Sequence, residues 1–153
     1  MISTAKDCHH QKDRDTFQDL EGLKILVVDD NRDSRYLISF ILENYGVEVM
    51  TSASALEALE VMGLFQPDVL VSDIVMPNVD GYSLIRRIRH DGSPNKDIPA
   101  IAVTSLDTEE TLDLAIKSGF QAFLIKPVEP DDFAELILSL YLEGSACNES
   151  RIS

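Results

Sequence analysis

Three aspartates, a threonine and a lysine in this 153-residue chain each stand at the end of a short apolar run, namely Asp29, Asp30, Asp73, Thr104 and Lys126. Clustered carboxylates repel one another unless a cation compensates, and oxygen ligands of this kind suit Mg²⁺. A lysine and a hydroxyl beside such a site can hold and neutralise a phosphoryl group. One carboxylate can then act as the nucleophile and give an aspartyl-phosphate. These residue types therefore predict phosphoryl-transfer chemistry, provided that the fold brings them together.

The elements that would bring them together are strands and helices in alternation. Short apolar runs predict buried strands over 24–29, 47–51, 68–73, 98–104 and 121–125. Amphipathic periodicity predicts helices over 31–45, 54–64, 81–90, 107–118 and 130–142. Five strand–helix pairs favour an α/β fold of three layers, a flavodoxin-like (βα)5 with a parallel sheet of order 2-1-3-4-5. The carboxyl ends of its strands share one rim, where ligands bind in such sheets.

Each candidate residue also has an ordinary structural explanation. Asp29 and Asp30 could be a strand end and a helix N-cap, and Asp73 could be a turn residue. Lys126 alone is most often a solvated lysine, and Thr104 alone an ordinary strand end. Coincidence of all of them at one rim is much harder to explain in this way. The combination therefore favours a functional site.

Composition narrows the class of protein. The 13 basic and 27 acidic side chains give a formal net charge of -14, which argues against nucleic acid and anionic membranes as direct partners. Cys8 and Cys147 are too few for a disulfide framework, and no apolar run suits a secretory signal or a bilayer span. We expect a cytoplasmic protein with a flexible tail over 1–22, one domain over 23–142 and a C-terminal tail over 143–153.

Residues 24–142 resemble the receiver domain of bacterial two-component response regulators, here of the single-domain type. The resemblance rests on the order and spacing of several short stretches: ILVVDDN at 25–31, DIVMP at 73–77 with DG at 80–81, TS at 104–105 and KP at 126–127. Any one of these stretches is weak, whereas the whole set is highly specific to the family.

The resemblance implies a role for each matching residue: Asp73 as the phosphoacceptor, Asp29, Asp30, Asp73 and the backbone carbonyl of Val75 as the Mg²⁺ site, Lys126 as the contact to the phosphoryl oxygens, Thr104 as the switch hydroxyl and Phe123 as the switch aromatic. It also implies a cis Lys126–Pro127 peptide. Phe123 could equally be a plain core aromatic. Separately, Val75 and Leu106 should flank the path of hydrolytic water and, being apolar, cannot activate it, so we expect a long-lived aspartyl-phosphate.

The resemblance also implies partners. The phosphoryl donor would be a phosphohistidine on a sensor histidine kinase or a histidine phosphotransfer protein. The chain would be a signalling phosphoacceptor rather than an enzyme, although it would assist its own phosphorylation and dephosphorylation. Its fourth helix, fifth strand and fifth helix would form the face that addresses a downstream protein or a second copy in a homodimer.

Three other readings stay open on the sequence. A haloacid-dehalogenase-like phosphatase also forms an aspartyl-phosphate, but it usually has Asp-x-Asp after the first strand and a cap domain. A flavodoxin-like FMN binder needs a phosphate loop there, which Asp29 and Asp30 would oppose. A receiver-like interaction module that never meets phosphate would not need the complete acidic and lysine set.

Overall fold

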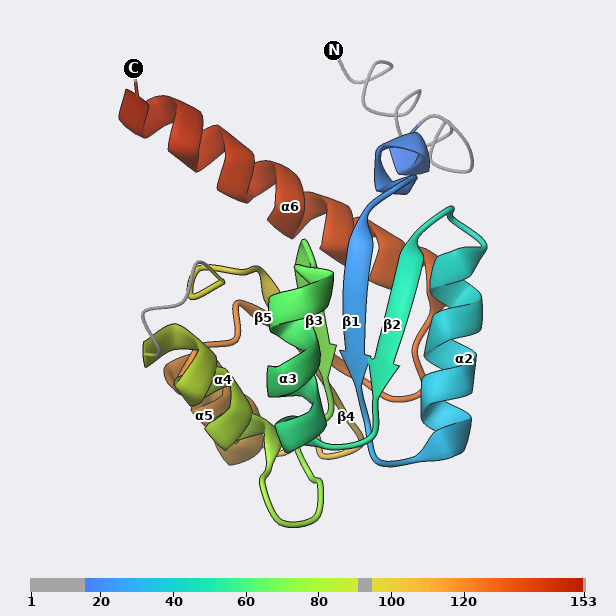
Figure 1. The fold of residues 1–153 in the computed structure, drawn as a ribbon, viewed down its shortest axis with the longest axis vertical. Helices are drawn as coiled ribbons and strands as arrows, with labels where there is room; N and C mark the ends of the chain where they lie inside the picture. The colour runs from blue at the N-terminus through green and yellow to red at the C-terminus, as the bar shows by residue number, and fades with distance from the viewer. Residues whose placement is uncertain (1–15, 91–94, 153) are drawn as a thin grey trace.

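The computed structural model describes residues 16–90 and 95–152, with side chains as far as residue 142. Strands and helices alternate as predicted (Figure 1). In chain order the elements are η2 (Thr16–Leu20), β1 (Lys24–Val28), α2 (Arg32–Glu43), β2 (Glu48–Ser52), α3 (Ala55–Phe65), β3 (Val69–Ser72), α4 (Gly81–His90), β4 (Ala100–Thr104), α5 (Glu109–Ser118), β5 (Ala122–Ile125) and α6 (Pro130–Ile152).

The strands form one parallel sheet of order β2-β1-β3-β4-β5, which confirms the predicted flavodoxin-like α/β fold. In Figure 1, α3 lies in front of the sheet, and the first turns of α6 lie behind β1 and β2. The strand order reverses between β1 and β3, whose last residues Val28 and Ser72 are paired. The segments that follow these two strands therefore leave the sheet side by side.

Two hydrophobic cores, one on each face of the sheet, hold the layers together. Alternate side chains of β1 point to opposite faces, as a strand requires. Ile25 and Val27 join the core under α2, α6 and η2, whereas Leu26 and Val28 join the core under α3, α4 and α5. Strands β3 and β4 are buried along their whole length, which explains why both are nearly continuous apolar runs in the sequence.

Side-chain caps fix where several helices begin. Ser54 is the N-cap of α3, since its Oγ accepts a hydrogen bond from the Glu57 amide at 3.2 Å. The helix expected from residue 107 begins later, because Thr108 rather than Asp107 is the N-cap. Thr108 has extended backbone angles, and its Oγ1 accepts from the Thr111 amide at 3.2 Å.

The ends of the described chain differ from the expected tails. Phe17 and Leu20 in η2 are buried against α6, so the expected tail over 1–22 does not describe residues 16–22, while residues 1–15 lie outside the described part. At the other end, α6 continues past the expected limit at 142 to Ile152. None of the helices within the described ranges has the length and apolarity needed to cross a membrane.

Candidate functional site

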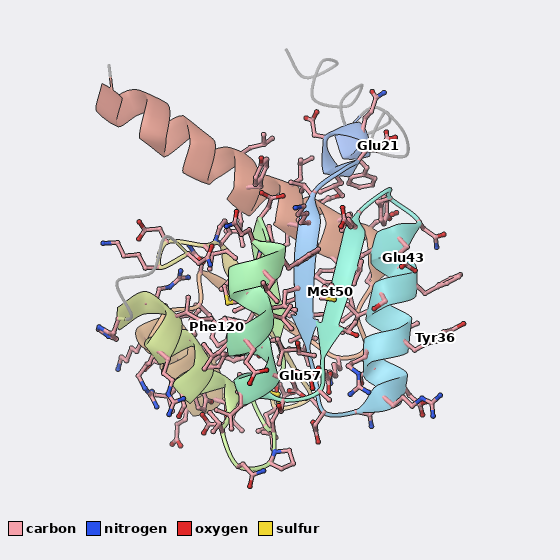
Figure 2. All side chains as sticks on the ribbon, viewed as in Figure 1. Glu21, Tyr36, Glu43, Met50, Glu57 and Phe120 are labelled. Carbon is pink, nitrogen blue, oxygen red and sulfur yellow. The ribbon has the colours of Figure 1, made fainter. Side chains whose placement is uncertain are left out.

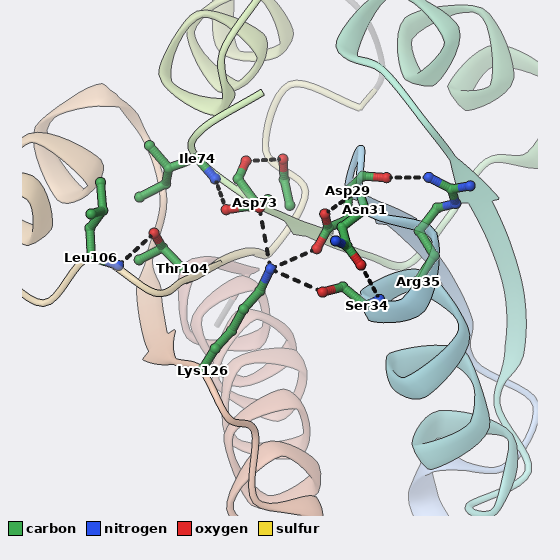
Figure 3. A network of polar contacts seen from close by, with 10 residues as sticks. Asp29, Asn31, Ser34, Arg35, Asp73, Ile74, Thr104, Leu106 and Lys126 are labelled. Carbon is green, nitrogen blue, oxygen red and sulfur yellow. Dashed lines mark hydrogen bonds and ion pairs between the residues drawn. The ribbon is translucent and has the colours of Figure 1, made fainter. Parts of the chain in front are cut away.

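The structure brings the predicted lysine and two of the aspartates together at the rim of the sheet. The Lys126 Nζ donates to Asp29 Oδ2 at 2.9 Å and to Asp73 Oδ2 at 3.2 Å. Lys126 follows β5, Asp29 follows β1 and Asp73 follows β3. The ends of three strands therefore meet in this one cluster (Figure 3). The cis Lys126–Pro127 peptide expected after β5 is confirmed.

Asp29, Asp30 and Asp73 form an acidic pocket. Ligand oxygens of the three carboxylates lie within 4.8 Å of one another. Asp29 is buried, Asp73 is half-buried, and Asp30 is exposed and has no hydrogen-bond or ion-pair partner among the described residues. One ammonium contacts two of the three acids, which leaves negative charge in excess. A hard divalent cation with oxygen ligands, such as Mg²⁺, therefore fits this pocket.

The loop after β3 is shaped around Asp73. The Asp73 Oδ1 accepts from the Ile74 amide at 2.7 Å, and its carbonyl accepts from the Ser72 hydroxyl at 2.8 Å. The Gly81 amide at the start of α4 donates to the Ile74 carbonyl at 2.7 Å. A Cβ atom on Gly81 would collide with the Asp73 carbonyl oxygen, so only glycine allows α4 to begin so close. This packing leaves Asp73 Oδ2 directed at Lys126.

Burial and charge shift the pKa values of the central pair. Burial raises the pKa of Asp73 above its usual 3.8, and the negative charge of Asp29 adds to the effect; Lys126 and the Ile74 amide lower it without cancelling the rise. Burial lowers the pKa of Lys126, but its hydrogen bond to Asp29 and the charges of both aspartates outweigh this, so the pKa lies above 10.5. Lys126 is therefore a permanent cation at neutral pH.

Thr104 ends β4, and its hydroxyl makes no hydrogen bond to Asp73 among the described residues. Its side chain is buried, and its Oγ1 accepts from the Leu106 amide at 3.1 Å. The Thr104 carbonyl accepts from the Lys126 amide at 2.9 Å, which ties the ends of β4 and β5 together. The side chains of Leu106 and Val75 are 45% and 57% exposed, and Phe123, on the edge strand β5, is 36% exposed. A plain core position for Phe123 is therefore wrong.

Two residues of α2 complete the network and were not found from the sequence. The Ser34 Oγ lies 3.4 Å from Lys126 Nζ, and Arg35 Nη1 donates to the Asp29 carbonyl at 2.7 Å. Asn31, the N-cap of α2, donates its amide to Asp29 Oδ1 at 2.9 Å. The only sequence signal for Ser34 and Arg35 is their place in the first turn of the helix that follows the acidic pair.

Comparison with known proteins decides the family. The model of the response regulator receiver domain family matches residues 25–138, which include the acidic pocket and all of the sheet except Lys24, the first residue of β1. The chain is a response regulator receiver domain. The resemblance noted from the sequence is thus confirmed, and the site at the sheet rim is the acidic pocket of a receiver domain, consistent with aspartyl phosphorylation.

Individual relatives agree with this assignment. An uncharacterised 14.6 kDa protein of Leptolyngbya boryana is 42% identical over 120 residues, which are 78% of this chain and 91% of that protein. The sensor histidine kinase RcsC of Escherichia coli is 36% identical over 125 residues, 82% of this chain but 13% of the kinase. The CAI-1 autoinducer sensor kinase/phosphatase CqsS of Vibrio cholerae is 38% identical over 71% of this chain and 16% of its own length.

Solved structures show the same fold. The receiver domain of the Francisella response regulator 1452 has a TM-score of 0.73 and 30% identity, covering 80% of this chain and 99% of that one. The chemotaxis protein CheY4 of Vibrio cholerae has a TM-score of 0.73 and 28% identity, covering 78% and 98%. Both solved domains are thus matched over almost their whole length by about four fifths of this chain.

Proposed function

We propose that this receiver domain accepts a phosphoryl group onto Asp73 from a phosphohistidine donor and passes the signal on through a changed surface. The observation that carries the proposal is the Lys126 ammonium, held between Asp29 and Asp73 at 2.9 and 3.2 Å over an acidic pocket that fits Mg²⁺. In this role the chain is a signalling phosphoacceptor and not an enzyme in the usual sense.

In the proposed transfer, Asp73 is the nucleophile. A carboxylate oxygen of Asp73 attacks phosphorus, the new P–O bond forms as the P–N bond to the donor imidazole breaks, and the imidazole leaves with the bonding electron pair. Lys126 starts in contact with the attacking carboxylate and can follow the charge onto the phosphoryl oxygens. The Ile74 amide holds the other carboxylate oxygen, which keeps Asp73 in one orientation.

Asp29, Asp30, Asp73 and the backbone carbonyl of Val75 would hold the Mg²⁺ ion. When bound, the ion supplies positive charge that neutralises the phosphoryl oxygens during transfer. Asp30, which is exposed and has no partner in the part of the chain that the structure describes, suits direct ligation. Asp29 already accepts bonds from Lys126 and from the Asn31 amide, which leaves it less free as a ligand.

The proposed switch begins at Thr104. Its hydroxyl oxygen now accepts from the Leu106 amide, so it must leave this contact before it can donate to a phosphoryl oxygen. Phe123, partly exposed on β5, would then turn toward the space beside Thr104. The two arrangements form a bistable element that local charge at Asp73 biases. The face that changes would comprise α5, β5 and α6.

A protein is the proposed donor, rather than a small phosphate ester. An apolar groove of about 350 Å³ opens beside the site and is lined by Ser34, Leu37, Ile38, Lys126, Pro127 and Val128. Leu37 of this lining is 50% exposed, and its neighbours on α2, Tyr36 and Phe40, are 75% and 55% exposed; Figure 2 shows Tyr36 pointing away from the sheet. Exposed aromatic groups of this kind are typical of protein interfaces. The similarity of this chain to segments of sensor kinases supports a histidine kinase or a histidine phosphotransfer protein as the phosphoryl donor.

The downstream partner is proposed to be a protein, with a second copy of the chain as one possibility. The net charge of -14 disfavours nucleic acid and anionic membranes as direct partners. A reducing cytoplasm suits a chain with two cysteines.

Acetyl phosphate with Mg²⁺ tests the central claim. We expect the intact mass of the wild-type chain to rise by one phosphoryl group, and the adduct to be labile to hydroxylamine, as an acyl phosphate is. Asp73→Asn should not be labelled, whereas Asp33→Asn, a matched control at an exposed acid in the first turn of α2, should be labelled like the wild type. Labelling of Asp73→Asn at the wild-type level would refute the proposal, and no labelling of either chain would favour an interaction module independent of phosphate.

A further inference from the structure

Arg35 contacts the acidic pocket from the side opposite to the reacting groups. Its Nη1 donates a hydrogen bond of 2.7 Å to the backbone carbonyl of Asp29, and its side chain is half-buried. Figure 3 shows the guanidinium on the far side of Asp29 from Asp73. Arg35 thus touches the backbone of the pocket but none of its carboxylate oxygens.

The Arg35 hydrogen bond completes the fixation of Asp29. The Asp29 amide donates to the Ser52 carbonyl at 3.1 Å and continues the pairing of β1 with β2. The two carboxylate oxygens accept from the Asn31 amide and from Lys126. The carbonyl of Asp29 is the remaining polar group, and it lies beyond the end of β1 at Val28. Arg35 supplies its partner, so each polar group of Asp29 is held.

The same hydrogen bond orients Asp30. The carbonyl of Asp29 and the amide of Asp30 belong to one planar peptide unit, so a donor that fixes the carbonyl also fixes the start of Asp30. The Asp30 carboxylate has no protein partner of its own in the described part of the chain. Its direction into the pocket therefore depends on the backbone that Arg35 holds.

We propose that Arg35 is a positioning residue for the metal-binding carboxylates of this domain. It acts through the Asp29–Asp30 peptide and keeps the oxygens of the acidic pocket within the 4.8 Å at which one cation can bind them together. This inference rests on the proposed function, in which the pocket binds Mg²⁺.

The charge of Arg35 and its hydrogen bond have opposite effects on Mg²⁺ affinity. A guanidinium beside a cation site repels the cation, so loss of the charge alone should tighten Mg²⁺ binding. Loss of the hydrogen bond frees the peptide and should weaken binding. Arg32 provides a matched control, because it lies one turn away on α2, is exposed and has no hydrogen-bond or ion-pair partner among the described residues.

The test is Mg²⁺ titration of the full chain by calorimetry for the wild type, Arg35→Met, Arg35→Lys and Arg32→Met, with thermal unfolding as a check of the fold. We expect Arg35→Met to bind Mg²⁺ about tenfold more weakly, as for other residues that orient metal ligands. Arg35→Lys keeps the charge and one donor, so it should bind between Arg35→Met and the wild type. Arg32→Met should bind as tightly as the wild type or slightly more tightly.

A second readout separates positioning from general damage to the fold. In acetyl phosphate labelling, Arg35→Met should need about tenfold more Mg²⁺ for half-maximal rate but approach the wild-type rate at saturating Mg²⁺. Mg²⁺ binding by Arg35→Met as tight as in the wild type, or tighter, would overturn the role of Arg35 alone. If Arg35→Met does not fold, wild-type affinity in Arg35→Gln, a polar side chain too short to reach the Asp29 carbonyl in the same way, overturns it. Absence of Mg²⁺ binding by the wild type would instead remove the proposed metal site and this inference together.

Discussion

Asp73 combines a functional requirement with a cost to the fold. Its pKa is raised because burial and the negative charge of Asp29 disfavour the ionised form, although Lys126 opposes both. A carboxyl whose folded-state pKa exceeds the unfolded value contributes stability that is fully present below the unfolded pKa, near 3.8, and is lost as pH rises through the folded pKa. At neutral pH, the ionised Asp73 therefore destabilises the domain while serving as the nucleophile.

Replacement of this charge should stabilise the fold at neutral pH. We expect Asp73→Asn to raise the free energy of unfolding by roughly 1 kcal/mol at pH 7, a typical size for one substitution. The gain should shrink as pH falls toward 3.8, because wild-type Asp73 then becomes neutral as well. Urea unfolding at several pH values measures it. Asp33→Asn, at an exposed acid, is the control, and a gain for Asp73→Asn that did not vary with pH would contradict the explanation.

Val75 and Leu106 place apolar side chains close in sequence to Asp73 and Thr104, where hydrolytic water would approach an aspartyl-phosphate. Their exposed apolar side chains follow Asp73 and Thr104 by two positions each, and neither can orient or deprotonate water. We expect the double variant Val75→Asn, Leu106→Asn to lose its aspartyl-phosphate roughly tenfold faster than the wild type. Loss of label after removal of the donor measures the rate. Leu114→Asn, at an exposed leucine of α5, should leave the lifetime unchanged, and equal lifetimes in all three chains would refute the idea.

At the scale of elements, η2 shows how a segment outside the family match joins the core. The match begins at residue 25, yet Leu20 is fully buried and Phe17 lies edge-to-face on Tyr45 with ring centroids 5.0 Å apart. The Tyr45 hydroxyl in turn donates to Asp131 at 2.7 Å, which links the end of α2 to the first turn of α6. The short helix η2 thus covers the hydrophobic core between α2 and α6.

We therefore expect Leu20→Ala to destabilise the domain by about 2–5 kcal/mol, the usual cost of truncating a buried leucine. Gln18→Ala, at an exposed position of the same short helix, should change stability by less than about 0.5 kcal/mol. Chemical unfolding of the full chain measures both. Equal effects for the two variants would mean that η2 is not packed on the core in solution.

The elements differ in how far the sequence could predict them. Buried parallel strands are continuous apolar runs, so all five were found, and their ends located the acidic pocket. Thr16–Leu20 was missed because two apolar residues three apart are too short a pattern to indicate a period. Arg35 was missed for another reason: its long side chain meets the Asp29 carbonyl only through the tertiary fold, and no local pattern encodes that contact.

At the scale of the whole molecule, charge limits association. Every copy carries a formal charge of -14, and phosphorylation adds more negative charge. Two copies therefore repel each other at long range, and only contacts at short range can hold a dimer. Salt screens this repulsion, since the Debye length falls from about 30 Å at 0.01 M to about 8 Å at 0.15 M ionic strength. Dimerisation of this chain should thus depend on both phosphorylation and salt.

These considerations give a prediction for the proposed face of α5, β5 and α6. Because the proposed switch at Thr104 and Phe123 changes this face, we expect the phosphorylated chain to dimerise more tightly than the unphosphorylated chain despite its added negative charge. Because salt screens the repulsion, the dimer dissociation constant should fall severalfold as salt rises over this range. Sedimentation of the chain with and without acetyl phosphate and Mg²⁺ measures it. Phe123→Asp, on the edge strand β5, should prevent dimerisation, whereas Leu64→Asp, at a 91% exposed position of α3, should not. A dimer that Leu64→Asp abolishes and Phe123→Asp preserves would contradict the proposed face and place the interface on α3 instead, without β5.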